Sequence, residues 1–569
     1  MEEVLTRDRM TGNDNRAMRK AFVSIIVLLA AAILPARSQG YVSERVYVST
    51  DRDVYVAGDD LFFSAFCLNT TNGGLSDGSR TAYLELVSSD GPVQTAKVAL
   101  EEGRGGGVMS LLNTIPTGNY RLVAYTAQCF NEDGYDFLEG SRTLSIINPF
   151  TTARASSGVE ILPEEDYNQL KDGNPHPSTG GIALNTSGPV TITNNTGRPV
   201  SLSLSVYHDD GIPSPETVNP VSFASKATSG RNFTDRRTAD YEGEIVRARL
   251  VGTAEDISAA EGSQAFLCIP GRIDDLYSSV IQKDGMVTFY TRNIYGDTDM
   301  VLDPGANTGN THLEIIPPFS GVSDPDIPSL PLSASLQERI LQRSMAMQVL
   351  RATGADSLYS VLPVPSFKPF NVEPAVYHLD DYTRFPLMEE LFIEYISEVS
   401  IRRTRSGREL IVSLHDDFRS VPYALQPCLA LLDGVPVTDH NQLLEYDPLL
   451  VEKIVIYQNT FFLGGRTYPG VINFVTYKGN LPSYTFGDNV RVVEFQGVSY
   501  PVVSWLPDTS GQAPDLRQTV LWHPQIELAP GESRTFEYCL PSYQGRFNVV
   551  VEGFDTAGNP VCAGGVIAN

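Results

Sequence analysis

Three histidines lie next to pairs of acids, and these residue types bind divalent metals or act in hydrolysis. The clusters are His208-Asp209-Asp210, His415-Asp416-Asp417, and His378 before Asp380-Asp381. On a strand, His208 and Asp210 would point to the same face and could share a metal ion. The alternative is a polar strand end that leads into a solvated turn. A metal-dependent hydrolase would need one cluster to meet further acids in a pocket.

The motifs of common enzyme families are absent from the sequence. It contains no H-E-x-x-H, no G-x-S-x-G and no G-x-x-x-x-G-K-[ST]. We therefore predict that the protein is not an enzyme and has no catalytic, cofactor-binding or metal-binding residues.

Four arginines lie close together in an otherwise acidic chain. They are Arg402, Arg403, Arg405 and Arg408 of the segment RRTRSGR. Guanidinium groups pair with phosphates and carboxylates, so this segment could bind lipopolysaccharide phosphates or an acidic partner. The alternative is that the arginines are the solvated faces of a strand hairpin. A second segment, YVSTDRD, could bind calcium, although it lacks the EF-hand pattern.

The N-terminal segment has the features of a secretory signal peptide. Arg19 and Lys20 precede an apolar run that ends at Leu34, and the small residue Ser38 follows. This order predicts a signal peptide over residues 1–38 and export of the rest of the chain. A single membrane anchor is the alternative, but this apolar run is short for a membrane span, which needs about 20 residues.

The chain without residues 1–38 is strongly acidic, with 36 basic and 64 acidic residues and a net charge of −28. Nucleic acid and anionic lipid both require a positive surface, so neither is expected as a general partner. We expect peripheral rather than integral membrane association, in the periplasm or at the outer membrane.

All six cysteines lie beyond the signal peptide. An exported chain can form disulfides, and Cys67 with Cys129, or Cys539 with Cys562, would each close a loop within one predicted domain. Buried free thiols are the alternative. No C-x-x-C spacing points to zinc.

Short apolar runs separated by glycine and proline predict several β-sandwiches. Residues 41–150 contain RVYVSTDRDVYVAGDDLFFSAF, which alternates polar and apolar residues around the turn at Ala57-Gly58-Asp59. Further strand-rich segments predict sandwiches over 180–245, 246–320 and 490–569. A Pro-rich linker with one helix fills 321–384, where Ser335 and Glu338 form a capping box.

Residues 385–480 combine a helix, expected over Leu387–Ser400, with short strands, which predicts a small α/β domain. Within it, Asp433-Gly434 supplies the positive-φ positions of a tight turn. Pro436 suits an edge strand, and Gly465 and Gly470 allow bulges or close packing.

Two resemblances follow from these segments. STDRDVYVAGDDLFF with IPTGNYRLVAYT resembles the second domain type of alpha-macroglobulins, although the thioester motif C-x-E-Q of that family is missing. The α/β segment resembles the plug domain of TonB-dependent transporters. The residues that match its motif include Asp433, Gly434, Val435, Pro436, Asp447, Pro448, Gly465, Tyr468, Gly470 and Thr476. The combination is similar to exported proteins of Bacteroidetes-type bacteria, which implies a location in the cell envelope.

A transporter barrel needs about 22 strands of roughly 10 residues, but only 90 residues follow Gly479. The expected fold is therefore mainly β, with tandem macroglobulin- or immunoglobulin-like sandwiches, a plug-like α/β domain and no transmembrane barrel. The expected function is a non-enzymatic cell-envelope binding or scaffold protein, which docks on an outer-membrane or envelope protein through the plug-like domain and sandwich edges. The alternatives are an accessory component of a TonB-dependent uptake system and the metal-dependent hydrolase considered above.

Overall fold

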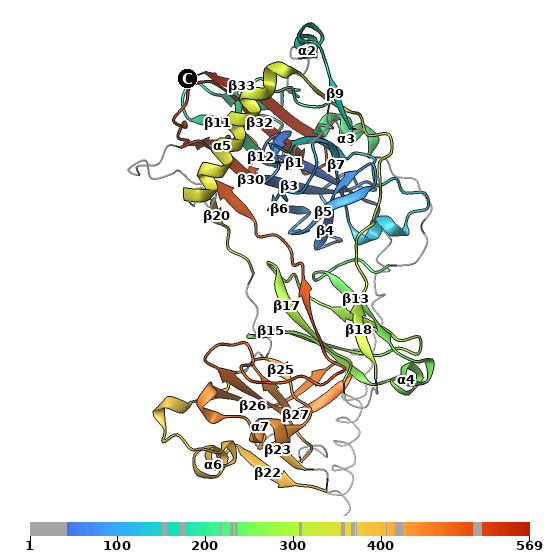
Figure 1. The fold of residues 1–569 in the computed structure, drawn as a ribbon, viewed down its shortest axis with the longest axis vertical. Coiled ribbons are helices and arrows are strands. Elements are labelled where there is room, and N and C mark those ends of the chain that lie inside the picture. The colour runs from blue at the N-terminus through green and yellow to red at the C-terminus, as the bar shows by residue number, and fades with distance from the viewer. Residues whose placement is uncertain are drawn as a thin grey trace, which may run out of the picture. The chain divides into compact units, whose positions relative to one another are not determined.

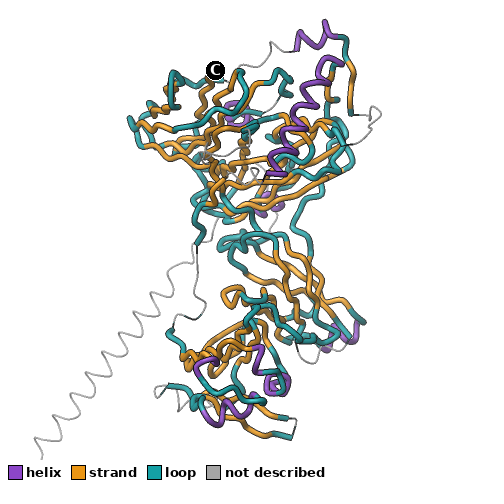
Figure 2. Tube along the Cα trace, turned by 60° about the vertical axis from the view of Figure 1, so that its left-hand side comes forward, coloured by secondary structure: helices purple, strands orange, loops and turns teal. Residues whose placement is uncertain are grey.

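The computed structural model describes residues 42–568 except 151–157, 171–176, 217, 228–232, 234–236, 306–309, 354–358, 366–369, 371, 406, 416–424 and 505–514. The expected signal peptide lies outside the described residues. Glu44–Asn569 form one compact unit, and Met1–Ser43 are the other. The larger unit is mainly β, with several sheets (Figures 1 and 2), which confirms the predicted fold class. Within the described ranges, no helix has the length and apolar character needed to cross a membrane.

The first sandwich is continuous in sequence. Its sheets have the orders β1-β3-β6 and β2-β8-β7-β4-β5, and the inward-facing residues of both form one apolar core. As the sequence predicts, a turn with Gly58 at φ +99° joins β2 to β3. The strands are β1 (Glu44–Thr50), β2 (Val54–Val56), β3 (Asp60–Asn69), β4 (Thr81–Ser88), β5 (Gly91–Ala99), β6 (Arg104–Ser110), β7 (Gly118–Tyr125) and β8 (Arg142–Ile147).

The second sandwich joins two distant segments and corrects two of the expected domains. Segments 180–245 and 490–569 were each expected to be a sandwich, but β12 pairs with both β30 and β32, so their strands share one core. The sheet orders are β10-β11-β31 and β30-β12-β32-β33. The strands are β10 (Ile182–Asn185), β11 (Val190–Asn194), β12 (Val200–Asp209), β30 (Thr519–Leu528), β31 (Ser533–Phe536), β32 (Arg546–Asp555) and β33 (Pro560–Ala568).

The third sandwich also takes a strand from a distant segment. Its sheets are β16-β13-β18 and β15-β14-β17-β28. Strand β28 comes from the segment assigned by sequence to the C-terminal sandwich, because Phe495 and its neighbours complete this core instead. The strands are β13 (Ile245–Val251), β14 (Gln264–Ile269), β15 (Arg272–Val280), β16 (Met286–Tyr290), β17 (Thr298–Asp303), β18 (His312–Ile315) and β28 (Arg491–Phe495).

The α/β domain has a five-stranded sheet of order β21-β26-β27-β24-β25 and a hairpin, β22-β23. Its helix is shorter than the expected Leu387–Ser400, because Val399 begins the hairpin by pairing with Val412. The elements are β21 (Ala375–His378), α6 (Met388–Glu394), β22 (Val399–Arg403), β23 (Arg408–Val412), β24 (Leu429–Leu432), β25 (Val435–Pro436), α7 (His440–Leu444), β26 (Val451–Leu463) and β27 (Arg466–Thr476).

These domains are nested. The α/β domain lies in sequence between β18 and β28 of the third sandwich, which itself lies between β12 and β30 of the second. Both ends of each inserted domain therefore connect to strands of the sandwich into which it is inserted.

The remaining elements lie in connections. Helix α5 begins at Gln337, two residues after Ser335, because the Ser333 hydroxyl rather than Ser335 caps the preceding 3₁₀ turn. Strand β9 pairs with β19, and β20 with β29. The bounds are β9 (Val159–Ile161), α2 (Glu164–Leu170), α3 (Pro220–Lys226), α4 (Ala254–Ala259), β19 (Leu330–Leu332), α5 (Gln337–Thr353), β20 (Tyr359–Val361) and β29 (Val502–Ser504).

All six cysteines are free thiols, so neither of the two expected disulfides, Cys67–Cys129 and Cys539–Cys562, is formed in the structure. Burial raises the pKa of the Cys129 and Cys562 thiols to about 11. Both therefore stay protonated at neutral pH, which corresponds to the alternative of buried free thiols.

Candidate partner-binding surface on the α/β domain

The Asp433-Gly434 turn has the conformation that its sequence predicts. Asp433 has φ +48° and Gly434 φ +82°, and the flanking Leu432 and Val435 pair as a two-residue hairpin. A Cβ on Gly434 would lie 3.2 Å from the backbone of Ile273 in the third sandwich. The turn therefore serves as a close contact with that sandwich, which the Gly271 N–H reinforces by donating to the Asp433 carbonyl oxygen at 2.8 Å.

The Asp433 carboxylate explains why Thr476 belongs to the same motif. The side chain of Asp433 is buried and accepts from the Thr476 N–H at 2.7 Å, from the Thr476 hydroxyl at 2.7 Å and from the Leu481 N–H at 2.9 Å. Three donors compensate for the loss of water around a buried carboxylate. This contact fastens the turn to the end of β27.

The other motif residues also build or anchor the domain. Val435 and Pro436 form the buried strand β25, and Asp447 caps the turn that contains Pro448. Gly465 closes the β26-β27 hairpin at φ +80°, and Tyr468 donates its hydroxyl to Gln264 of the third sandwich. Gly470 has φ +90°, and its Cβ position lies 2.5 Å from Val412, so only glycine fits there. Each of these ten residues therefore has a role in the folding or attachment of the α/β domain.

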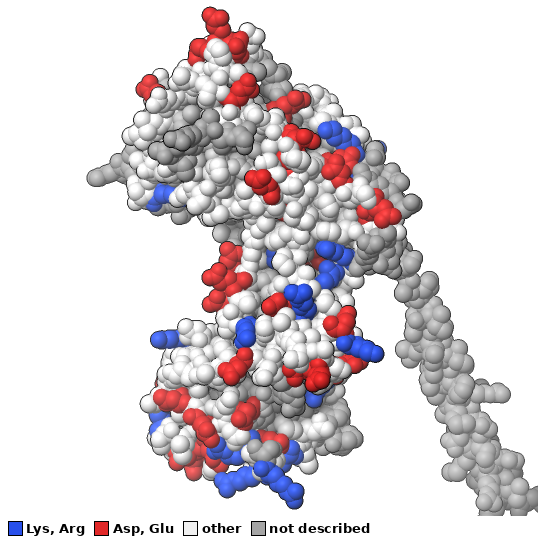
Figure 3. All heavy atoms as spheres, turned by 45° about the vertical axis from the view of Figure 1, so that its right-hand side comes forward, with Lys and Arg blue, Asp and Glu red and all other residues white. Residues whose placement is uncertain are grey.

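The four arginines lie on or beside the β22-β23 hairpin, as expected if they were the solvated faces of a strand hairpin. Three of them form ion pairs with acidic side chains. Arg402 pairs with Glu409 at 2.5 Å, Arg403 with Glu389 at 3.5 Å, and Arg408 with Glu389 and Glu445 at 3.2 and 2.6 Å. Arg405 is exposed and has no carboxylate partner among the described residues. Figure 3 shows basic and acidic side chains intermixed on this domain.

Arg403 and Arg405 are therefore the available cations. The Arg403 side chain is 81% exposed, and its contact with Glu389 is long. Exposed ion pairs of this kind contribute about 0–1 kcal/mol, so a partner can compete for the guanidinium.

Two exposed aliphatic side chains lie on segments that contact these arginines. The Arg402 guanidinium donates to the Leu425 carbonyl at 2.6 Å, and Leu425 is 73% exposed. Ile393 is 72% exposed and lies one helical turn after Glu389, the acid that Arg403 contacts. Arginine is enriched at protein interfaces, and exposed apolar side chains add surface that a partner can bury. We use the name hairpin face for the exposed side chains around this hairpin, which are Ile393, Arg403, Arg405 and Leu425. Leu425 lies on the Arg402 side of β22, because Arg402 and Arg403 are successive residues of a strand and point to opposite sides.

The sequence did not identify the residues that position this hairpin. His440 accepts the Leu410 N–H through Nδ1 at 2.8 Å, and burial lowers the pKa of His440, so the neutral ring suits this role. Asn441 accepts the Arg408 N–H at 3.0 Å. Neither residue has a local sequence signal, because its partner lies about 30 residues away in the chain.

The three histidine clusters do not form a common site. His208 is on β12, where its ring packs against Tyr543 and Phe547, and Asp210 pairs with Arg343. His378 and His415 belong to the α/β domain, whereas Asp416 and Asp417 lie outside the described residues. No group of three or more metal-ligand side chains occurs within the described ranges.

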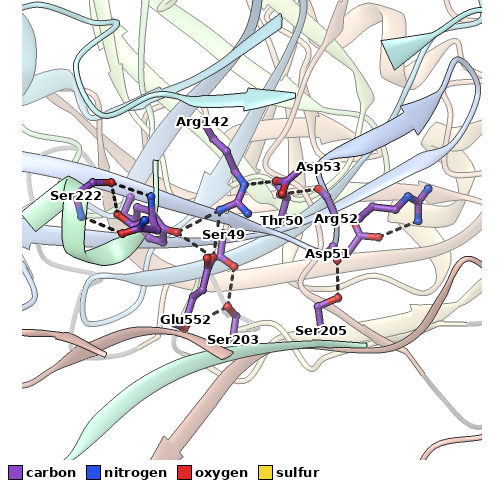
Figure 4. Close-up of polar contacts among 12 residues, drawn as sticks. Ser49, Thr50, Asp51, Arg52, Asp53, Arg142, Ser203, Ser205, Ser222 and Glu552 are labelled. Carbon is purple, nitrogen blue, oxygen red and sulfur yellow. Dashed lines mark hydrogen bonds and ion pairs between the residues drawn. The ribbon is translucent and has the colours of Figure 1, made fainter. Parts of the chain in front are cut away.

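The YVSTDRD segment forms a buried ion-pair network between the first two sandwiches (Figure 4). Arg142 reaches Asp53 at 2.9 Å and Glu552 of β32 at 3.1 Å. Arg52 pairs with Asp51 at 3.0 Å, and burial raises the pKa of Asp51. Arginines therefore pair with the carboxylates of this segment, and Arg142 joins the first sandwich to the second.

No protein-family model and no curated protein matches the sequence. Among solved structures, the chain is similar to Escherichia coli alpha-2-macroglobulin activated by porcine elastase, with 8% identity, a TM-score of 0.24, and coverage of 92% of this chain and 44% of that chain. Salmonella alpha-2-macroglobulin reacted with methylamine gives 12% identity, a TM-score of 0.21, and coverage of 92% and 39%. The Escherichia coli adhesin FdeC gives 12% identity, a TM-score of 0.14, and coverage of 49% and 64%. The chain spans less than half the length of these two macroglobulins, and similarities at this level define no shared site or activity.

Proposed function

We propose that the chain is a non-enzymatic binding or scaffold protein of the cell envelope. Its sandwiches act as spacers, and its α/β domain docks on an outer-membrane or envelope protein. The proposed location, in the periplasm or peripherally at the outer membrane, rests on the signal-peptide pattern of residues 1–38.

The observation that carries this proposal is the hairpin face. The motif residues at Asp433, Gly434 and Tyr468 attach the α/β domain to the third sandwich, so they are occupied within the chain. The exposed Arg403 and Arg405 belong to another part of the domain, the β22-β23 hairpin. The domain thus combines an internal anchor with a separate surface that remains open to a partner.

A second candidate is an accessory role in a TonB-dependent uptake system. This candidate rests on the resemblance to the plug motif, whose residues lie together in the α/β domain. In that case the hairpin face would meet a barrel protein supplied by another chain.

A crosslinked pull-down of the tagged protein from native outer membranes tests both candidates. The informative variant is Arg403→Glu with Arg405→Glu. The control is Arg249→Glu, because Arg249 is 63% exposed and pairs with Glu314 at 3.4 Å, much as Arg403 pairs with Glu389. We expect the double variant to lose its crosslinked partner and the control to retain it.

The identity of the crosslinked protein separates the candidates. Stoichiometric recovery of a barrel protein supports the uptake role, and recovery of another envelope protein supports the scaffold role. Recovery of the chain alone from the soluble periplasm contradicts docking. An unchanged partner in the double variant contradicts the assignment of the hairpin face.

A further inference from the structure

A cleft of about 840 Å³ lies between the first and third sandwiches. Its walls come from the segment around Arg104, from β15 and the segment after β16, and from the connecting segments near Leu362 and Tyr500, and Gln525 of β30 in the second sandwich also lines it. Direct contacts join the walls, since the Asn293 amide donates to the Arg80 carbonyl at 3.0 Å. Small-molecule sites usually have volumes of about 300–1,000 Å³ and often lie between domains.

Two tyrosines form an aromatic wall in this cleft. The rings of Tyr295 and Tyr500 have centroids 5.4 Å apart and planes inclined at 32°, and both side chains are partly exposed. Gly296 permits this arrangement. Its φ is +74°, and a Cβ on this residue would lie only 3.0 Å from the Tyr500 ring. Such rings present apolar faces beside a polar hydroxyl, which suits a ligand with both C–H and O–H groups.

The charges that line the cleft balance. The four arginines are Arg80, Arg104, Arg272 and Arg292, and the four acids are Glu101, Glu242, Asp274 and Asp275. A strongly charged ligand would gain no net attraction from this set. An apolar ligand would remove water from these side chains without replacing their hydrogen bonds, which is costly. Planar guanidinium, carboxylate and amide groups instead supply many paired donors and acceptors.

We propose that this cleft binds an uncharged polyhydroxylated ligand of the size of a short oligosaccharide. The ligand's C–H faces lie on Tyr295 and Tyr500, and its hydroxyls bond to the charged side chains. This site goes beyond the docking role, and it shares no residue with the hairpin face.

The test is binding of the full chain to an array of neutral oligosaccharides of two to six glucose, mannose, galactose or N-acetylglucosamine units, with titration calorimetry on the best one. We expect binding that persists in 0.5 M NaCl and weakens at least tenfold in Tyr500→Ala. The matched control is Tyr290→Ala. Tyr290 is 51% exposed and pairs with Tyr241 at 6.1 Å on the third sandwich, outside the cleft.

Tyr295→Ala provides a second variant in case Tyr500→Ala fails to fold. The proposal is overturned if no neutral probe binds or if a folded cleft variant binds as well as the wild type. It is also overturned if Tyr290→Ala weakens binding as much as the cleft variants do, or if salt abolishes binding. The hairpin double variant keeps its sugar binding under this proposal, so failure of docking and failure of this site are distinguishable.

Discussion

Asp240 makes the stability of the junction between the first and third sandwiches depend on pH. Its carboxylate is buried and accepts from the Tyr83 hydroxyl of β4 at 2.8 Å and the Ile245 N–H at 2.9 Å. The nearby Lys97 ammonium forms an ion pair with Glu244 rather than with Asp240, at 2.7 Å. Burial, with a smaller contribution from the charge of Glu244, raises the pKa of Asp240 from 3.8 to about 7.

The sign of the effect follows from the direction of this shift. The folded protein holds a proton on Asp240 that the unfolded chain releases near pH 4, so this contribution to stability is complete below pH 4 and lost as the pH rises through 7. A shift of about three units corresponds to about 4 kcal/mol at 1.36 kcal/mol per unit. The side chain of Asp240→Asn cannot ionise, and its amide can still form hydrogen bonds with Tyr83 and Ile245. We therefore expect that the stability of this variant does not fall as the pH rises.

Hydrogen exchange of the segment around Asp240, measured between pH 4.5 and 8.5 and corrected for intrinsic rates, tests the prediction. We expect protection of the wild type to fall across this range relative to Asp240→Asn. The control is Asp299→Asn, an exposed carboxylate in the same sandwich, which should follow the wild type. Parallel pH profiles for the wild type and Asp240→Asn would refute the reasoning.

Three further substitutions test the α/β anchor and the buried network. Gly434→Val should destabilise the α/β domain by about 1–3 kcal/mol, because valine resists positive φ; limited proteolysis should cut this domain faster, and an unchanged pattern would contradict the turn assignment. Thr476→Val removes one donor to the Asp433 carboxylate and should cost about 1–3 kcal/mol, seen as faster exchange at the end of β27; equal exchange rates would show that this contact does not stabilise the domain. Arg142→Met leaves two buried carboxylates without their cation and should cost about 3–5 kcal/mol. Unfolding by urea, followed by tryptophan fluorescence, should shift to lower concentration, and an unshifted midpoint would count against the network.

Local signals predicted the short-range features of the fold. The Asp433-Gly434 turn has both expected positive φ values, and the turn at Gly58 lies where the alternation of polar and apolar residues placed it. Both depend on residues adjacent in sequence. The helix that begins at Met388 was predicted too long, because the pairing of Val399 with a strand outweighs helix propensity.

Long-range pairing could not be predicted in the same way. The alternating pattern of β12 shows that it is a strand but does not name its neighbours, β30 and β32. The ion pairs of the arginine hairpin could not be predicted from the sequence either, because Glu389 and Glu445 reach Arg408 from two different helical segments. The cleft at Tyr295 and Tyr500 gives no pattern in sequence, because its two rings are 205 positions apart, on either side of the α/β domain.

The nested order of the domains has a consequence for synthesis of the chain on the ribosome. Strand β12 ends at Asp209 and is central in its sheet, but both of its neighbours, β30 and β32, come from Thr519 onward. Both edges of β12 stay unpaired while the third sandwich and the α/β domain are being synthesised. Unpaired strand edges promote aggregation. Production of the folded protein therefore depends on shielding β12, for example by a chaperone, until β30 and β32 have left the ribosome.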